Sequence, residues 1–498
     1  MIEKYYSGVI EQIYNRIGKE TRNIVMANYS NDFSIENLEV IRRYQSNEDN
    51  VFFAYSEFSY NTLVGAYEPF LDIICNMHRR FIGGSFDDFQ KECGVYYLHR
   101  QVLNSYYETG ECFREETVLL NEVAYEQRRM TMAIADMLKR LSEVRPLMIV
   151  INRFQMASKS SIETIKYLID NPCANIGIVL GVNAIVKGAD STVEVWDRIV
   201  ESLEDRSAIY YIGSAGPLKN NIKTTNDDEL YITMNFEQSI QEASNIMEFL
   251  DYEQARRGCR IIEHKIKFEN AWIDEKSLRR FYLVYARTSV LLGEMSKAIE
   301  LMNEYKALIP ENDSEHYFSL YYFMKGTCYM YQGKLEKAEG CAKKAYDYAL
   351  LADDELLEFK SELLSVMIKM SGWYNIFFCV QDIPVSDEII EKLIKHGYRN
   401  HLAHIYIYAY DNSRDVVKQS FYDESLLKHF TKGLELAKEI GNEQLVYDAY
   451  QKTIMLASTS GLNEIAFLYV IRTYEFMKGQ YICCESAYVY RLQFKCHG

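Results

Sequence analysis

The chain has 498 residues, of which 48% are hydrophobic and 25% are charged. This length and composition are typical of a globular protein with two or three domains. The formal net charge is −16. Such a charge argues against direct binding to nucleic acid or to an anionic membrane, because basic side chains supply much of that affinity.

Neither a signal peptide nor a membrane span is visible in the sequence. No N-terminal segment combines a charged start with an apolar core, and no apolar run approaches the ~20 residues that cross a bilayer. The 11 cysteines are odd in number and include no Cys-x-x-Cys spacing. We therefore expect reduced thiols and a cytoplasmic protein.

The first part of the chain alternates between helical and strand-like patterns. An amphipathic pattern over residues 2–17, ended by Gly18, predicts a helix. Short apolar runs predict five strands, at residues 23–27, 51–55, 147–151, 175–181 and 208–212. Helical patterns lie near residues 35–43, 63–80, 114–143, 161–169 and 193–204. This alternation predicts a parallel sheet covered by helices on both faces.

Beyond residue 218 the strand-like runs disappear and helical patterns continue to about residue 491. A glycine is followed five residues later by an alanine at three places: Gly293 and Ala298, Gly333 and Ala338, and Gly461 and Ala466. This spacing resembles the tetratricopeptide repeat, in which small residues let two antiparallel helices pack closely. We therefore expect residues 221–498 to form an all-α helical solenoid of this kind.

The segment LMIVINRFQMASKSSIETIKYLI, residues 147–169, reads as a buried strand, a polar loop and an amphipathic helix. It resembles the segment around the acidic strand of signal transduction ATPases with numerous domains, the AAA-related class that includes maltose-activator-type regulators. The residues that fit are Gln155, Ala157, Ser161 and Ile162, and those that depart are Asn152, Arg153, Met156 and Ser158. AYEPFLDII at 66–74 and IGSAGPL at 212–218 are similar to two other segments of that family. The resemblance implies a P-loop-NTPase-like α/β domain over residues 1–220.

The resemblance also places a phosphate-binding loop after the first strand, at residues 27–34. The Gly-x-x-x-x-Gly-Lys-Ser/Thr spacing falls on Ala27, Asp32, Phe33 and Ser34, of which only Ser34 fits. Such a loop uses glycines so that backbone N–H groups curl around phosphate, and a lysine to offset its charge. Phe33 removes that cation, and Asp32 adds a carboxylate.

The other half of a nucleotide site is altered as well. Mg²⁺ and the attacking water need carboxylate oxygens at the end of the acidic strand, where this chain has Asn152 and Arg153. We therefore expect a degenerate pocket, that of a pseudo-ATPase, with no catalytic residues and no metal. No cofactor is required, although weak binding of ATP or ADP stays open.

Two classes of function follow. In the first, the chain is a non-catalytic regulatory module that binds protein or peptide partners through its helical repeats. In the second, ATP or ADP still binds, and the chain is the signalling switch of a transcriptional regulator or a diguanylate cyclase. An enzyme of unrelated chemistry on an α/β scaffold is a third and remoter class. Relatives of this architecture, bacterial ones among them, usually attach an output module after the repeats, so we also expect a partner or an output domain on a longer parent chain.

The lid, the histidines and the tyrosines bear further on these expectations. Between residue 218 and the helices that begin near residue 236 there is no room for the winged-helix lid of such ATPases. Either the lid is absent or part of the assigned repeat region is the lid.

His396, His401 and His404 cluster in KHGYRNHLAH, and a spacing of three suits metal binding on a helix. No cysteine or carboxylate nearby in the sequence completes a metal site, so we expect these histidines to lie on the surface or to take part in packing. The 41 tyrosines predict mainly packing between helices, with a minority forming a rigid peptide-binding surface.

Overall fold

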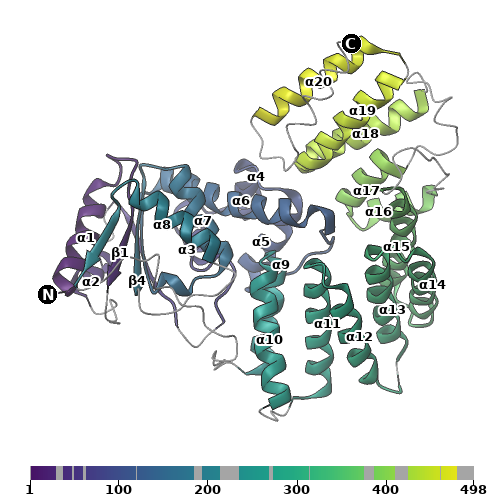
Figure 1. Ribbon diagram of the computed structural model, residues 1–498, viewed down its shortest axis with the longest axis horizontal. Coiled ribbons are helices and arrows are strands. Elements are labelled where there is room, and N and C mark those ends of the chain that lie inside the picture. The colour runs from purple at the N-terminus through teal and green to yellow at the C-terminus, as the bar shows by residue number, and fades with distance from the viewer. Residues whose placement is uncertain are drawn as a thin grey trace. The chain divides into compact units, whose positions relative to one another are not determined.

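The computed structural model describes residues 2–29, 38–46, 50–59, 63–118, 120–183, 193–213, 235–268, 273–312, 314–374, 386–409, 424–459 and 461–478 (Figure 1). Contacts divide the chain into two compact units. The first consists of Met1–Val95, His99–Arg114 and Glu126–Ser277. The second consists of Tyr96–Leu98, Glu115–Tyr125 and Leu278–Gly498.

A five-stranded parallel sheet forms the centre of the first unit, and all five expected strands are present. They are β1 (Ile24–Tyr29), β2 (Phe52–Glu57), β3 (Leu147–Asn152), β4 (Ile176–Asn183) and β5 (Ile209–Ile212). Their order across the sheet is β2-β3-β4-β1-β5, and each neighbouring pair runs parallel. Because β4 lies between β1 and β3, the ends of those two strands can meet only across β4.

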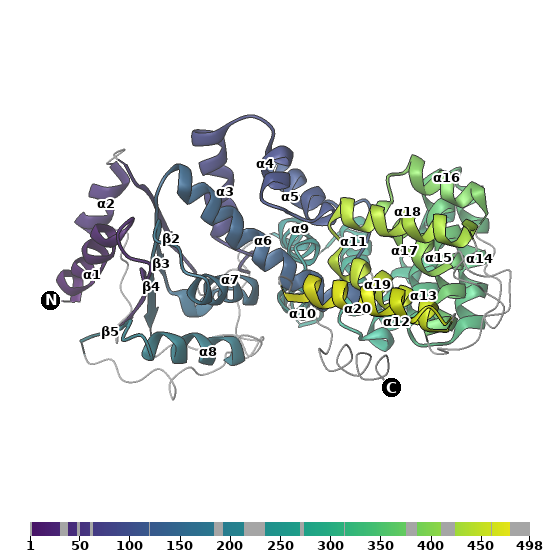
Figure 2. The same cartoon turned by 90° about the horizontal axis from the view of Figure 1, so that it is seen from above.

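Helices cover both faces of this sheet, as Figure 2 shows: α1 and α2 lie on one side, and α3, α6, α7 and α8 on the other. The helical elements up to residue 204 are α1 (Ile2–Arg16), α2 (Glu39–Ser46), α3 (Phe70–Met77), η1 (His78–Ile82), α4 (Phe86–Glu92), α5 (Tyr97–Thr109), η2 (Leu120–Glu122), α6 (Val123–Val144), η3 (Phe154–Met156), α7 (Lys159–Asp170) and α8 (Val193–Glu204). The prediction of a single helix over residues 114–143 is wrong at its start, because α6 begins only at Val123.

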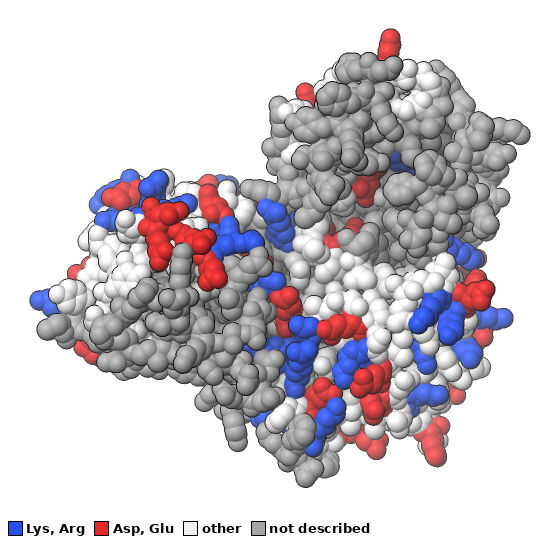
Figure 3. All heavy atoms as spheres, in the orientation of Figure 1, with Lys and Arg blue, Asp and Glu red and all other residues white. Residues whose placement is uncertain are grey.

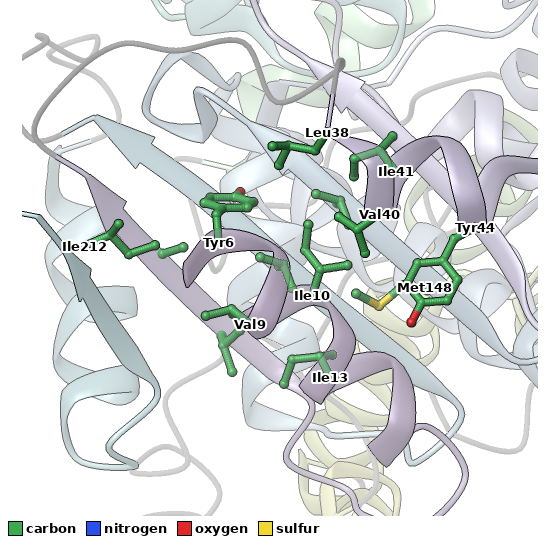
Figure 4. Packing of buried hydrophobic residues seen from close by; sticks show 14 of the residues in the cluster. Tyr6, Val9, Ile10, Ile13, Leu38, Val40, Ile41, Tyr44, Met148 and Ile212 are labelled. Carbon is green, nitrogen blue, oxygen red and sulfur yellow. The ribbon is translucent and has the colours of Figure 1, made fainter. Parts of the chain in front are cut away.

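The core on the α1 side arises from helical periodicity. Tyr6, Val9, Ile10 and Ile13 recur on one face of α1 and are all buried against the sheet (Figure 4). Fully burying a side chain of this size contributes about 1.5–3 kcal/mol. Residues of α2 extend the same cluster, and Tyr44 of α2 stacks on Tyr14 with ring centroids 4.0 Å apart.

Two helices that follow the sheet in sequence belong to the same unit: α9 (Phe236–Glu248) and α10 (Tyr252–Phe268). Buried Asp251, between them, accepts a hydrogen bond from the backbone N–H of Ser160 at 3.0 Å. The side chain of Gln254 donates to the carbonyl of Val64 at 3.0 Å. The first compact unit therefore extends past residue 220, the domain boundary expected from the sequence.

The second unit consists of helices joined mostly by short turns, which makes consecutive helices antiparallel neighbours (Figure 1). They are α11 (Glu275–Leu291), α12 (Met295–Ala307), α13 (Ser314–Tyr331), α14 (Leu335–Leu351), α15 (Glu355–Tyr374), α16 (Asp387–Lys395), α17 (Arg399–His404), η7 (Ile405–Ala409), α18 (Glu424–Ile440), α19 (Glu443–Thr459) and α20 (Asn463–Lys478). The expected fold class, a parallel α/β sheet followed by a helical solenoid, is confirmed.

Charged side chains of both signs are interspersed on the visible described surface, and no continuous basic surface appears there (Figure 3). In the described parts of the chain, every helix is too short or too polar to cross a membrane.

Candidate functional site

The carboxyl ends of β1 and β3 are joined by their own side chains. The hydroxyl of Tyr29, the last residue of β1, donates a hydrogen bond to Oδ1 of Asn152, the last residue of β3, at 2.5 Å. Both residues are fully buried. The bond passes over Gly181 of β4, where an added Cβ would lie only 2.8 Å from Asn152 Oδ1. The glycine therefore allows the side chains of β1 and β3, the two strands that flank β4, to meet.

A glutamate and an arginine continue this network. Asn152 Nδ2 donates to Glu57 Oε1 at 3.2 Å, and Arg153 Nη1 forms an ion pair with the same oxygen at 3.0 Å. Tyr55 donates its hydroxyl to the other oxygen of Glu57. Arg153 has a left-handed backbone conformation (φ 54°), which is uncommon for a residue with a side chain. Among the described residues of this network, the one carboxylate, Glu57, is thus paired with a guanidinium.

Tyr6 of α1 closes the network from the helix side. An added Cβ at Gly181 would lie even closer to the Tyr6 hydroxyl than to Asn152. Burial raises the pKa of Tyr6 well above its usual value, and the charges of Tyr29, Tyr55 and Glu57 raise it further. The hydroxyl is therefore neutral, and the described groups at this edge of the sheet are uncharged or paired.

These residues do not fit a magnesium nucleotide. Mg²⁺ takes oxygen ligands from carboxylates and phosphates, whereas β3 ends in an amide held by Tyr29 and in a guanidinium held by Glu57. The strand that should lead into the phosphate loop also continues too far. Ala27 is a fully buried residue inside β1, paired with Gly181 of β4, and the strand ends only at Tyr29. Asp32, Phe33 and Ser34 lie outside the described residues.

The three glycine–alanine pairs occupy equivalent places in the helical unit. Gly293, Gly333 and Gly461 lie in the turns that precede α12, α14 and α20, with φ of 78°, 71° and 74°. Such positive φ values favour glycine. Ala298, Ala338 and Ala466 follow on these helices and are fully buried. An added Cβ at Gly326 of α13 would lie 3.4 Å from the carbonyl oxygen of Ala338, so α13 and α14 approach closely at that point.

A buried polar network in the second unit was not expected from the sequence. Glu116 is completely buried, and its Oε1 lies 2.6 Å from His401 Nδ1. Glu122 is buried as well, and its Oε1 lies 2.9 Å from His404 Nε2. Asn442, at the start of α19, donates to Glu122 Oε1 at 3.2 Å. Both glutamates therefore have polar partners from distant helices.

The two members of the Glu122–His404 pair shift each other's pKa. Burial alone would raise the pKa of Glu122, but the charge and hydrogen bond of His404 hold it below its usual value. Burial would lower the pKa of His404, but Glu122 keeps it above its usual value, with help from Asp448 and Glu116. Each partner therefore favours the charged form of the other.

The histidine cluster is used for packing and pairing. His401 and His404 are buried against separate glutamates, and His396 stacks on Phe359 with ring centroids 4.6 Å apart. Among the described residues, no group of three or more His, Cys, Asp or Glu side chains is placed to hold a metal ion.

Sequence reasoning missed Tyr6, Tyr29, Glu57 and Gly181 at the sheet edge. It also missed the two glutamates of the helical unit. Tyr29 and Asn152 are 123 positions apart, and Glu116 and His401 are 285 apart. A local pattern carries no signal for contacts at that separation. For the second network, the spacing of the histidines was the only signal in the sequence, and it pointed to the histidines but not to the glutamates.

The sequence matches no protein-family model and no curated protein. Solved structures give matches, among them a signal transduction ATPase with numerous domains that has a tetratricopeptide repeat sensor, from Pyrococcus horikoshii. The sequence identity is 13% and the TM-score 0.42, over 94% of this chain and 82% of that chain. At these values the similarity assigns neither an activity nor a partner to this chain.

Proposed function

We propose that the chain is a regulatory signalling protein whose α/β unit no longer hydrolyses nucleotide and whose helical unit binds a protein or peptide partner. The observation that carries the first half is the linked edge of the sheet. Tyr29 and Asn152 bond to each other, and Arg153 is paired with Glu57, where hydrolysis would need carboxylates for Mg²⁺ and water. Charge stabilisation of that kind normally lowers the barrier to hydrolysis by several kcal/mol.

The surface of the helical unit supports the second half. Several partly buried tyrosine rings on α13 lie beneath basic side chains: Tyr317 beneath Arg279, Tyr322 beneath Lys344, and Tyr329 beneath Lys337. Aromatic rings with cations over them form rigid, amphipathic surfaces, and tyrosine and arginine are enriched where proteins bind proteins. Basic groups in a chain of net charge −16 favour an acidic partner segment.

Calorimetry and turnover with Mg-ATP and Mg-ADP test the proposal. We expect no hydrolysis above background and dissociation constants weaker than roughly 1 mM, equivalent to ~4 kcal/mol of binding. A chain with Asp32→Gly and Phe33→Lys is the matched control, since it restores two positions of the phosphate loop while Asn152 and Arg153 stay. It should also lack turnover. A micromolar dissociation constant for the unaltered chain would refute the proposal and favour the nucleotide switch.

A further inference from the structure

The segment that carries Glu116 and Glu122 belongs to the second unit and is neither helix nor strand up to Val118, with bends at Glu115 and Glu116. Side chains alternate strictly between exposed and buried from residue 111 to residue 118, the period of an extended chain. In the part that belongs to the second unit, Glu116 and Val118 are buried, while Glu115 and Thr117 are exposed. The segment then makes one short turn, η2, which contains Glu122.

Four residues surround the two carboxylates, and we call Asn400, His401, His404 and Asn442 the His–Asn cluster. All four are buried. Glu116 accepts from the backbone N–H groups of Asn400 and His401 at 3.1 and 2.5 Å, besides its contact with the His401 ring. Glu122 contacts the side chains of His404, Asn442 and Asn400 at 2.9, 3.2 and 3.3 Å.

The cluster itself is held in place from within the second unit. Asn442 Nδ2 donates to Asn400 Oδ1 at 2.7 Å, and the Tyr96 hydroxyl donates to the same oxygen at 2.8 Å. Asn442 also accepts the backbone N–H of Leu445 at 3.0 Å, which caps α19. The donors that face the two glutamates are therefore fixed in direction by other helices.

Two tyrosines contact the backbone of the segment. The Tyr398 hydroxyl donates to the carbonyl of Glu115 at 2.7 Å, and the N–H of Leu120 donates to the Tyr331 hydroxyl at 3.2 Å. Contacts to the main chain combined with pockets for alternate side chains are how proteins recognise extended peptides. The segment is thus held in the same way as a bound peptide.

Stability alone accounts poorly for this arrangement. A buried ion pair often contributes no more than apolar side chains of the same volume, whereas one that has lost a partner is strongly destabilising. Hydrogen bonds to a carboxylate from fixed donors discriminate strongly against a ligand that lacks the charge. Donors from α17 and α19 that converge on two carboxylates are therefore suited to selecting one ligand.

We propose that the His–Asn cluster, with Tyr331 and Tyr398, is a binding site for an acidic peptide with two glutamates separated by five residues, and that residues 115–118 and 120–122 occupy it as an internal ligand. A partner protein with a segment of the same chemistry competes for the site. This inference rests on the proposed function, and it specifies the class of peptide that the helical unit binds.

The test uses the full chain with Glu116→Gln and Glu122→Gln, which weakens the internal ligand. The probe is a fluorescent peptide with the sequence of residues 113–126, and a second probe has glutamine at both positions. Fluorescence anisotropy should show the native-sequence probe binding this variant at least about tenfold more tightly than the glutamine probe. It should bind the unaltered chain at least about tenfold more weakly, because a tethered segment competes at a high effective concentration.

Two controls separate recognition from general charge effects. Adding His401→Gln and His404→Gln to the variant should abolish the preference for the native-sequence probe. A probe with Glu115→Gln removes one negative charge at an exposed position, half the change made in the glutamine probe, and its affinity should stay within about twofold. Equal binding of the native and glutamine probes, or a comparable loss with the Glu115→Gln probe, would overturn the proposal.

A measurement on the unaltered chain covers the case in which the variant does not fold. An excess of the native-sequence probe should accelerate hydrogen exchange in residues 115–122, the Leu120 amide included, and the glutamine probe should not. Unchanged exchange at a saturating peptide concentration would overturn the proposal. Nucleotide turnover would refute the proposed function and leave these titrations unaffected, so the two failures are distinguishable.

Discussion

Gly181→Ala tests whether the carboxyl edge of the sheet is as tightly filled as the structure indicates. An added Cβ would lie 2.8 Å from Asn152 Oδ1, 3.4 Å from Asn152 Cα and closer still to the Tyr6 hydroxyl. Both polar groups must move, and the buried hydrogen bond from Tyr29 to Asn152 weakens. We expect a loss of about 2–4 kcal/mol, from overpacking together with a damaged buried hydrogen bond.

Two companion variants make the test specific. Gly8→Ala is the same chemical change in α1, where nothing lies within 4 Å of the added Cβ, and it should gain about 0.5–1 kcal/mol of helix stability. Tyr6→Phe removes the nearest obstacle, so Gly181→Ala should cost less in that background by about 0.5 kcal/mol or more.

Urea denaturation followed by circular dichroism measures the free energies of unfolding, and amide exchange in β1 and β4 follows the first unit separately. The reasoning is refuted if Gly181→Ala is no more destabilising than Gly8→Ala. It is also refuted if the cost of Gly181→Ala is unchanged by Tyr6→Phe.

Three further changes test other parts of the chain. Ala338→Leu should cost about 1–3 kcal/mol by overpacking α13 against α14, and exposed Glu336→Ala no more than about 0.5 kcal/mol; equal melting temperatures would show that the repeat register is wrong. Burial, with Arg129 and Arg114 nearby, lowers the pKa of His99 to about 4, against about 6.5 when unfolded. The unfolded chain therefore takes up this proton first, and the first unit should lose up to about 3 kcal/mol as the pH falls from 6.5 to 4. His99→Gln should remove that part of the pH dependence, and parallel stability curves would contradict the assignment. Burial and the charge of Glu68 raise the pKa of Glu242 to about 7, against about 4.3 when unfolded. The unfolded chain therefore releases this proton first, and stability is lost as the pH rises from about 4.3 to 7. Glu242→Gln should add about 1–3 kcal/mol at pH 8 and little at pH 4.5, and melting at the two pH values measures the difference.

The sequence by itself determined the parts of this protein that depend on local pattern. Strands buried on both faces must be apolar along their whole length, and runs such as residues 147–151 therefore marked the sheet. The turn before α14 needs a residue that tolerates positive φ, and the close approach of α13 needs a small one. Gly333 and Ala338 meet those needs with a spacing visible in the sequence.

Only the tertiary structure decided how distant side chains are paired. The order of the strands places β4 between β1 and β3, and that order alone brings Tyr29 to Asn152. Residues 114–122 show the same limit, because their pattern predicts the start of a helix. The described residues there are non-helical up to Val118 and form one short turn at Leu120–Glu122, and the α-helix begins only at Val123. Buried donors of α17 and α19 hold both carboxylates, and contacts of this kind override a local helical preference because each buried charge needs its partner.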